Sequence, residues 1–221
     1  MTNIPSGSQA LSTQQQAIVP IGAFGAEGNM VKLCAALNHG LDAGLTISDS
    51  REILVQLYAY AGFPRSLNAL AELMKVQEGR KHRGIQDAAG PAPARPIPTG
   101  AALLAAGTAN QTTLSGGPVK GPVLDFAPAI DEYLKTHLFG DIFERDNLDW
   151  KSRELATVSM LAALPGVEAQ LQAHMRISMN AGLTEEQLRE LCVLLEERVD
   201  EDAARRAREA LERQLAVASG R

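Results

Sequence analysis

The stretch "LDAGLTISDSREILVQLYAYAG", residues 41–62, returns in altered form as "MNAGLTEEQLRELCVLLEERVD", residues 179–200. Both stretches contain Ala-Gly-Leu-Thr, and Gly44 pairs with Gly182 at an offset of 182 − 44 = 138 residues. The same offset relates further pairs: Thr46 and Thr184, Glu52 and Glu190, Leu57 and Leu195. Internal similarity of this kind predicts an architecture of two related units.

Each copy has the pattern of a helix, a Gly-Leu-Thr connection and a second helix. Gly44 and Gly182 are expected just beyond the helix C-termini, where a left-handed backbone favours glycine. Thr46 and Thr184 are expected to cap the following helices. So short a connection predicts an antiparallel helical hairpin, which buries its apolar stripe only against another unit. Few aromatics (4%) and abundant Ala and Leu also favour an all-α fold.

Proline- and glycine-rich stretches predict how the chain is divided into units. We assign residues 1–82 to the first unit, 83–124 to a Pro/Gly-rich linker and 125–221 to the second unit. Within the linker, "GPAPARPIPTG" is expected to be extended. The segment "DFAPAIDEYLKTHLFGDIF" that follows is predicted as one helix, with Phe126, Ile130, Leu134 and Leu138 on its apolar face.

Composition narrows the possible partners and the compartment. Apolar residues make up 45% and charged residues 21%, typical of a globular protein, and the net charge of -5 argues against nucleic acid as partner. No apolar run approaches the length of a membrane span, and "MTNIPSGSQALSTQQQ" lacks the pattern of a secretion signal, so we expect neither. Two cysteines do not form a disulfide framework, which favours a cytoplasmic location.

His174 is the sharpest candidate for chemistry. At about 100° per residue, Val167, Leu171, His174 and Ser178 fall within one narrow arc, which places the imidazole on an apolar helix face. It is either a core histidine satisfied by a backbone carbonyl or a general acid/base in a pocket. Glu154, on the preceding helix, is predicted either to orient this imidazole or to form a rim ion pair. Arg153 is expected to point outward.

The first copy carries a helix break that the second lacks: "YAYAGFP" at residues 58–64 becomes "EERVDED" at 196–202. Gly62 is expected to end one helix and Pro64 to begin the next, with Phe63 extended between them. The free N–H groups at this helix start are predicted to hold a substrate carboxylate. The side chains predicted to assist are Tyr58, Tyr60, Arg65 and Asn68. The alternative is an ordinary helix corner, with the tyrosines at an oligomer interface.

The cysteines and the remaining histidines give no sign of a metal or cofactor. Cys34 falls on the apolar face of its helix, and His39 lies about 140° away around the axis. Cys192 also lies on an apolar stripe. Because the four histidines show no ligand spacing, we expect no metal and no organic cofactor.

Two stretches carry a family resemblance. "GDIFERDNLDWKSRELATVSMLAALPGVEAQLQAHMRISMNAGLT", residues 140–184, and "EILVQLYAYAGFPRSLNAL", residues 52–70, resemble carboxymuconolactone decarboxylases. The resemblance implies the all-α alkylhydroperoxidase D-like fold and trimeric or hexameric assembly. The peroxidase branch uses Glu, Cys-x-x-Cys and His, and Glu154 and His174 match its Glu and His. The positions that match its cysteines fall near Val167 and Gln170, which are not thiols.

The sequence therefore predicts an all-α protein of two alkylhydroperoxidase D-like units, forming a homotrimer or a dimer. Our leading hypothesis is a carboxymuconolactone decarboxylase-like enzyme that acts on a small acidic or lactone metabolite. His174 would be the acid/base and Glu154 its partner. One alternative is a peroxidase-like antioxidant protein. The other is a non-catalytic oligomer that binds a small ligand or has a structural role.

Overall fold

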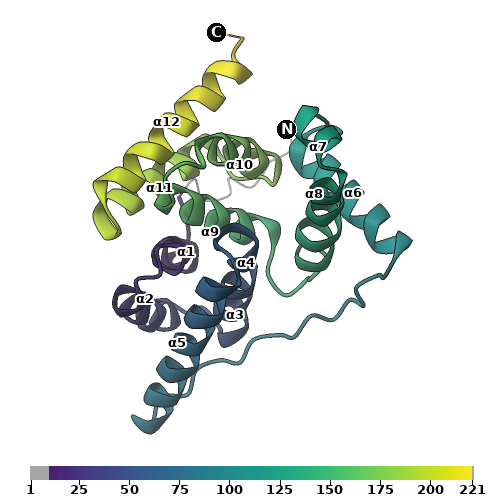
Figure 1. Ribbon diagram of the computed structural model, residues 1–221. Coiled ribbons are helices and arrows are strands. Elements are labelled where there is room, and N and C mark those ends of the chain that lie inside the picture. Colours follow the sequence, from purple (N-terminus) through teal and green to yellow (C-terminus); the bar gives the residue numbers. More distant parts are fainter. Residues whose placement is uncertain (1–9, 221) are drawn as a thin grey trace, which may run out of the picture.

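The computed structural model describes residues 10–220, and within that range the chain is all helical with no β-strand (Figure 1). The all-α prediction is confirmed. The first helices are α1 (Thr13–Glu27), α2 (Met30–Asp42), α3 (Ile47–Gln56), α4 (Tyr58–Ala61), α5 (Phe63–His82) and α6 (Ala101–Ser115). They are followed by α7 (Pro122–Phe126), α8 (Pro128–Tyr133), a π-helix (Leu134–Ile142), α9 (Trp150–Ala163), α10 (Glu168–Asn180), α11 (Glu185–Arg198) and α12 (Glu201–Ala218).

Helices α1 and α9 form the centre of the molecule, with α10 beyond α9 on one side and α4 on the other (Figure 1). Both central helices are buried around almost their whole circumference. They cross so closely that a Cβ at Gly22 would lie 2.9 Å from the carbonyl oxygen of Ala156. One apolar core runs continuously through this crossing and joins the two ends of the sequence.

The caps at both Gly-Leu-Thr connections form as predicted, but the antiparallel hairpins do not. Helices α2 and α3 hardly touch, and α10 packs against α9 and α12 instead of α11. Gly44 and Gly182 lie just beyond α2 and α10 with φ of 96° and 100°, the left-handed region that favours glycine. Thr46 and Thr184 cap α3 and α11 through capping boxes, whose third residues are Asp49 and Gln187. These caps are local interactions, which is why they can be predicted from a few neighbouring residues.

The range that the sequence assigns to a linker has two parts. Residues 85–99 contain no helix and run along the outside of the molecule (Figure 1), where the carboxylate of Asp146 accepts hydrogen bonds from the backbone N–H groups of Ala94 and Arg95. Residues 101–115 form helix α6, which packs against the π-helix and α10. A second, smaller apolar cluster lies at this contact and includes Leu114, Leu138 and Phe139.

The predicted single helix over residues 125–143 is wrong, because Pro128 breaks it. Ala127 adopts non-helical φ and ψ of -128° and 73°, so α7 ends and α8 begins there. Because the helix is interrupted at Ala127, the four residues predicted to share one apolar face no longer do so. Phe126 is 89% exposed and Ile130 46% exposed, whereas Leu138 is buried.

Within residues 10–220, no helix combines the length and the apolar character that a bilayer crossing requires. Residues 1–9, the first part of the segment considered for a secretion signal, lie outside the described range.

Candidate active site

The structure brings Glu154 and His174 together in the core. Nδ1 of His174 lies 2.8 Å from Oε2 of Glu154, which is hydrogen-bonding distance. Glu154 comes from the centrally buried α9 and is fully buried, and His174 comes from the inner face of α10 and is 7% exposed. Of the partners predicted for the histidine, the carboxylate is the one found.

The break after α4 places an aromatic ring over this pair. Gly62 takes up the change of direction with φ of 84° and ψ of 160°, and α5 begins at Phe63 with Pro64 in its first turn. The predicted extended conformation of Phe63 is therefore wrong, because Gly62 alone makes the turn. Tyr60 approaches His174 edge-on, with ring centroids 5.5 Å apart.

Three buried oxygen atoms of the site have no hydrogen bond within the described structure: Oε1 of Glu154, Oγ of Ser178 and the hydroxyl of Tyr60. Ser178 follows His174 by one turn of α10 and is fully buried. Burial, and then the nearby Glu154, raises the pKa of Tyr60 well above its ordinary value, so the phenol keeps its proton. Thr157 lies close enough to affect this pKa, but no hydrogen bond of ordinary geometry reaches the phenol. Unpaired buried polar atoms are costly, so each of these three oxygens requires an explanation.

Arg153 is the residue that sequence reasoning placed wrongly. It was expected to point outward, but it is fully buried, and its Nη2 donates to Oε2 of Glu52 at 3.2 Å. Arg145 donates to both oxygens of Glu52, each at 2.7 Å. The periodicity argument assumed that this side of α9 faces solvent, and the packing of α3 against it removes that exposure.

Glu52 is the residue of this region that the sequence missed as a site component. Burial opposes its charge, but Arg145, then Asn147 and Arg153, outweigh that effect and lower its pKa. The available signals were its pairing with Glu190 at the 138-residue offset and its position one residue before the apolar run of α3. Neither signal indicated which arginines it meets.

A second polar contact joins α3 to α9, one helical turn before Tyr60 in the sequence. Nε2 of Gln56 donates to the hydroxyl of Thr157 at 2.6 Å and to the backbone oxygen of Arg153 at 3.0 Å. Gln56 lies one turn before Tyr60. The network therefore fixes the end of α3, from which the short α4 extends toward His174.

The other predicted substrate contacts lie elsewhere. Tyr58 stacks on Phe63 with ring centroids 4.6 Å apart. Nη1 of Arg65 donates to the carbonyl of Ala26 near the C-terminus of α1, and Asn68 is exposed on α5. The structure thus brings Glu154, His174 and Tyr60 together, but Tyr58, Arg65 and Asn68 do not join them through any described contact.

The cysteines lie on other helices. Cys192 is buried on α11, and Cys34 is half-buried on α2, so the prediction of a core position is met more fully by Cys192. Within residues 10–220, no three His, Cys, Asp or Glu side chains converge as a group able to hold a metal ion.

Comparison with known proteins identifies the part of the chain that carries this pair. Residues 128–213 match the carboxymuconolactone decarboxylase family. The chain is also similar to the 4-carboxymuconolactone decarboxylase of Acinetobacter baylyi, with 33% identity over 67 residues, 30% of this chain and 49% of that protein. The chain thus spans about half the length of this relative. The family match contains Glu154 and His174, while Tyr60 lies outside it.

Proposed function

We propose that this protein is a carboxymuconolactone decarboxylase-like enzyme in which His174 is the acid/base and Glu154 its partner. The observation that carries the proposal is the buried Glu154–His174 hydrogen bond of 2.8 Å, surrounded by three buried oxygens without partners. A purely structural histidine needs its own partner, but it does not require unpaired oxygens around it. The family match over residues 128–213 supports the same assignment.

The geometry gives each side chain a distinct task. When Nδ1 of His174 carries a proton, it donates to Oε2 of Glu154, which fixes the ring and leaves Nε2 to take or deliver a proton. Tyr60 keeps its proton because its pKa is raised, and it is therefore available as a hydrogen-bond donor. The hydroxyl of Ser178 can donate or accept. Such a set suits a small substrate whose carboxyl or lactone oxygens need donors while a proton moves.

A peroxidase-like activity finds less support in the site. That chemistry needs a thiolate close to the histidine, and the matching positions at the start of α10 are Val167 and Gln170. Burial raises the pKa of Cys192 to about 11, which works against the reactive thiolate. Hydroperoxide turnover by the protein would support the peroxidase alternative. Ligand binding without turnover would support the non-catalytic alternative.

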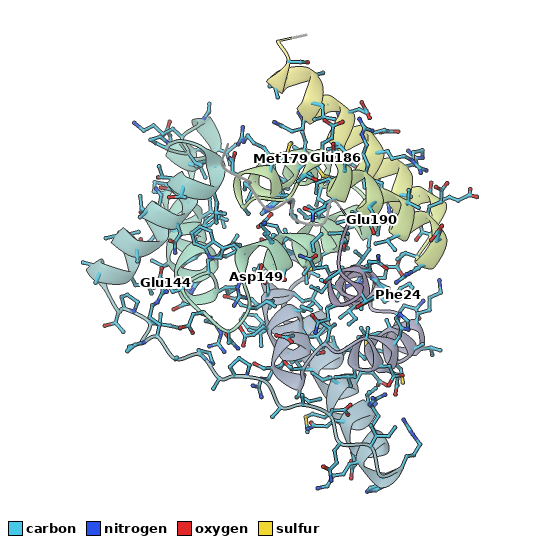
Figure 2. All side chains as sticks on the ribbon, turned by 180° about the vertical axis from the view of Figure 1, so that it is seen from behind. Phe24, Glu144, Asp149, Met179, Glu186 and Glu190 are labelled. Carbon is cyan, nitrogen blue, oxygen red and sulfur yellow. The ribbon has the colours of Figure 1, made fainter. Side chains whose placement is uncertain are left out.

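We also propose that residues 1–82 and 125–221 are related units that exchange contacts across the α1–α9 crossing. Glu52 of the first range meets Arg145 and Arg153 of the second. Its counterpart at the 138-residue offset is Glu190, which Figure 2 labels. Glu190 accepts hydrogen bonds from the backbone of Leu11 and the side chain of Gln16. These reciprocal contacts support the repeat.

A homotrimer or dimer remains our proposal for the assembly. The segment of residues 50–61 is apolar on several sides, which would favour assembly, but Ile53, Leu54 and Leu57 are buried within the single chain. A better support is the outer face of α5, where exposed apolar side chains follow helical spacing. They are Phe63, Leu67 and Met74, 61–71% exposed. A light-scattering mass of a 23.6 kDa monomer at micromolar concentration would contradict the proposal.

The enzymatic proposal is tested with a panel of small lactones and dicarboxylates that includes 4-carboxymuconolactone, with substrate loss and CO₂ release as readouts. We expect turnover by the wild type and a loss of about 10² to 10⁴ in the Glu154→Gln variant. Glu209→Gln, on the exposed face of α12, is the matched control. Absence of turnover across the panel, with ligand binding retained, would favour the non-catalytic role.

A further inference from the structure

A hollow of about 370 Å³ lies where α1, α2 and the end of α11 meet, on the side of the molecule where Figure 2 labels Phe24. Its floor is apolar and comes from Pro20 and Phe24 of α1 and Ala36 of α2. It is lined by residues other than Glu154 and His174. An apolar floor of this size accommodates a single ring or a short branched chain.

Basic side chains surround this floor, and no carboxylate lines it. They are Lys32, His39 and Arg198. Nζ of Lys32 lies 5.2 Å from the ring centroid of Phe24, and Nη2 of Arg198 makes only a long hydrogen bond of 3.4 Å to Gln16. Within residues 10–220, neither cation has an ion-pair partner within 4.0 Å.

Two acidic residues lie near the rim. Glu27 is influenced by Lys32, Arg206 and Asp200, and burial and then Asp200 raise its pKa. Neither Glu27 nor Asp200 lines the hollow. The cations above the apolar floor therefore remain available to an anion.

The 138-residue offset relates this hollow to the His174 site. His174 corresponds to Ala36 (174 − 138), Glu154 to Gln16 (154 − 138), and Tyr60 to Arg198 (60 + 138). In the first unit, the acid/base groups are thus replaced by a methyl group and an amide, while a guanidinium takes the place of the phenol. The exchange removes proton chemistry and adds a group that binds carboxylates well.

We propose that this hollow is a second, non-catalytic binding site for a small organic carboxylate with an apolar body. The apolar body lies on Pro20, Phe24 and Ala36, and the carboxylate lies between Arg198 and Lys32. Charge complementarity selects the anion, and the apolar floor selects against small hydrated anions. The assignment does not depend on catalysis at His174.

The probe for the test is benzoate, titrated into the full chain at low salt and followed by calorimetry and by NMR of ¹⁵N-labelled protein. Benzyl alcohol serves as the uncharged analogue. We expect benzoate to bind, to shift amide signals of α1 and α2, and to bind more weakly as salt rises. We expect Arg198→Gln and Lys32→Gln each to weaken binding by about tenfold, because each removes a charge-assisted contact. Lys81→Gln, an exposed lysine of α5, is the matched control and should bind like the wild type.

Two further variants separate the outcomes. His174→Gln should bind benzoate normally, so a failure of the catalytic proposal leaves this one standing. If Arg198→Gln does not fold, Lys32→Gln at an exposed position gives the same information. Lack of benzoate binding by the wild type, equal binding of benzyl alcohol, or binding unaffected by both variants would each overturn the proposal.

Discussion

The ring of Tyr60 meets the imidazole of His174 edge-on, with the two planes at 82° and the centroids 5.5 Å apart. The two residues lie in different halves of the chain, and each reaches the other across the α9 helix that carries Glu154. The candidate site is therefore completed only when both halves pack together. The helix break at Gly62 ends the four-residue helix α4, and α4 carries Tyr60 to His174.

Replacing His174 by Gln distinguishes catalysis from structure. Gln keeps hydrogen-bonding capacity but does not titrate, so a catalytic His174 predicts a loss of about 10² to 10⁴ in turnover with little change in Tm. A structural histidine predicts unchanged turnover and a loss of about 1 to 3 kcal/mol in unfolding free energy. The control is His137→Gln on the exposed face of the π-helix, which should change neither quantity.

The Tyr60→Phe variant tests whether the unpaired hydroxyl serves a ligand. The hydroxyl is buried without a hydrogen bond, so its removal should raise the unfolding free energy by about 1 kcal/mol. If it donates to substrate, turnover should fall by about tenfold. Tyr133→Phe, at a 54% exposed tyrosine, is the control. A variant that is less stable and fully active would contradict the assignment.

Neutralising Glu52 leaves Arg153 buried without its counter-ion. We expect Glu52→Gln to lower the unfolding free energy by about 3 to 5 kcal/mol in urea denaturation, as for other broken buried pairs. Glu209→Gln, which removes exposed pairs on α12, should cost less than about 1 kcal/mol.

The same carboxylate predicts an acid dependence. The pKa of Glu52 is lowered from its ordinary 4.5, so the folded state binds this proton less readily than the unfolded state. Its contribution to stability is therefore present above pH 4.5 and is lost as pH falls through the lower folded value. The Glu52→Gln variant should lose that part of the pH dependence. An unchanged acid-unfolding curve would show that the pair does not act as described.

Adding one methyl group at the α1–α9 crossing should be costly. A Cβ at Gly22 would lie 2.9 Å from the carbonyl oxygen of Ala156, and backbone on a buried helix cannot yield easily. We expect Gly22→Ala to lower the unfolding free energy by about 1 to 3 kcal/mol. Gly79→Ala in α5 meets only the flexible end of Arg83 at 3.6 Å and should be neutral or stabilising by up to about 1 kcal/mol.

The two thiols should differ in alkylation rate. Cys192 is 3% exposed and burial raises its pKa to about 11, so it should react only when the chain unfolds. Cys34 is half-buried and should react first, although burial and then Glu72 raise its pKa as well. The Cys34→Ala, Cys192→Ala double variant should keep the activity of the wild type. Hydroperoxide turnover that disappears in this variant would support a peroxidase instead.

The sequence by itself determined local features, namely where helices end and which side of a helix faces inward. The glycines and threonines of the two Ala-Gly-Leu-Thr stretches predicted where the helices end and begin, because helix ends depend on a few neighbouring residues. They did not predict that the joined helices pack mainly against other helices. Helical periodicity placed His174 on an inner face and Glu154 within its reach, because the two lie on successive helices. The offset of 138 residues predicts two related units, which stays a prediction.

The tertiary structure alone decided which distant side chains meet. Arg153 is buried where α3 packs on α9, because Glu52 and Gln56 of α3 and the backbone of Arg145 are its partners. Periodicity within one helix carries no information about that contact. Tyr60 reaches His174 while Tyr58 turns to Phe63, although the two tyrosines are separated by a single residue. That choice depends on the direction that Gly62 gives the chain and on the packing of α4 against α9, which are contacts between residues far apart in the sequence.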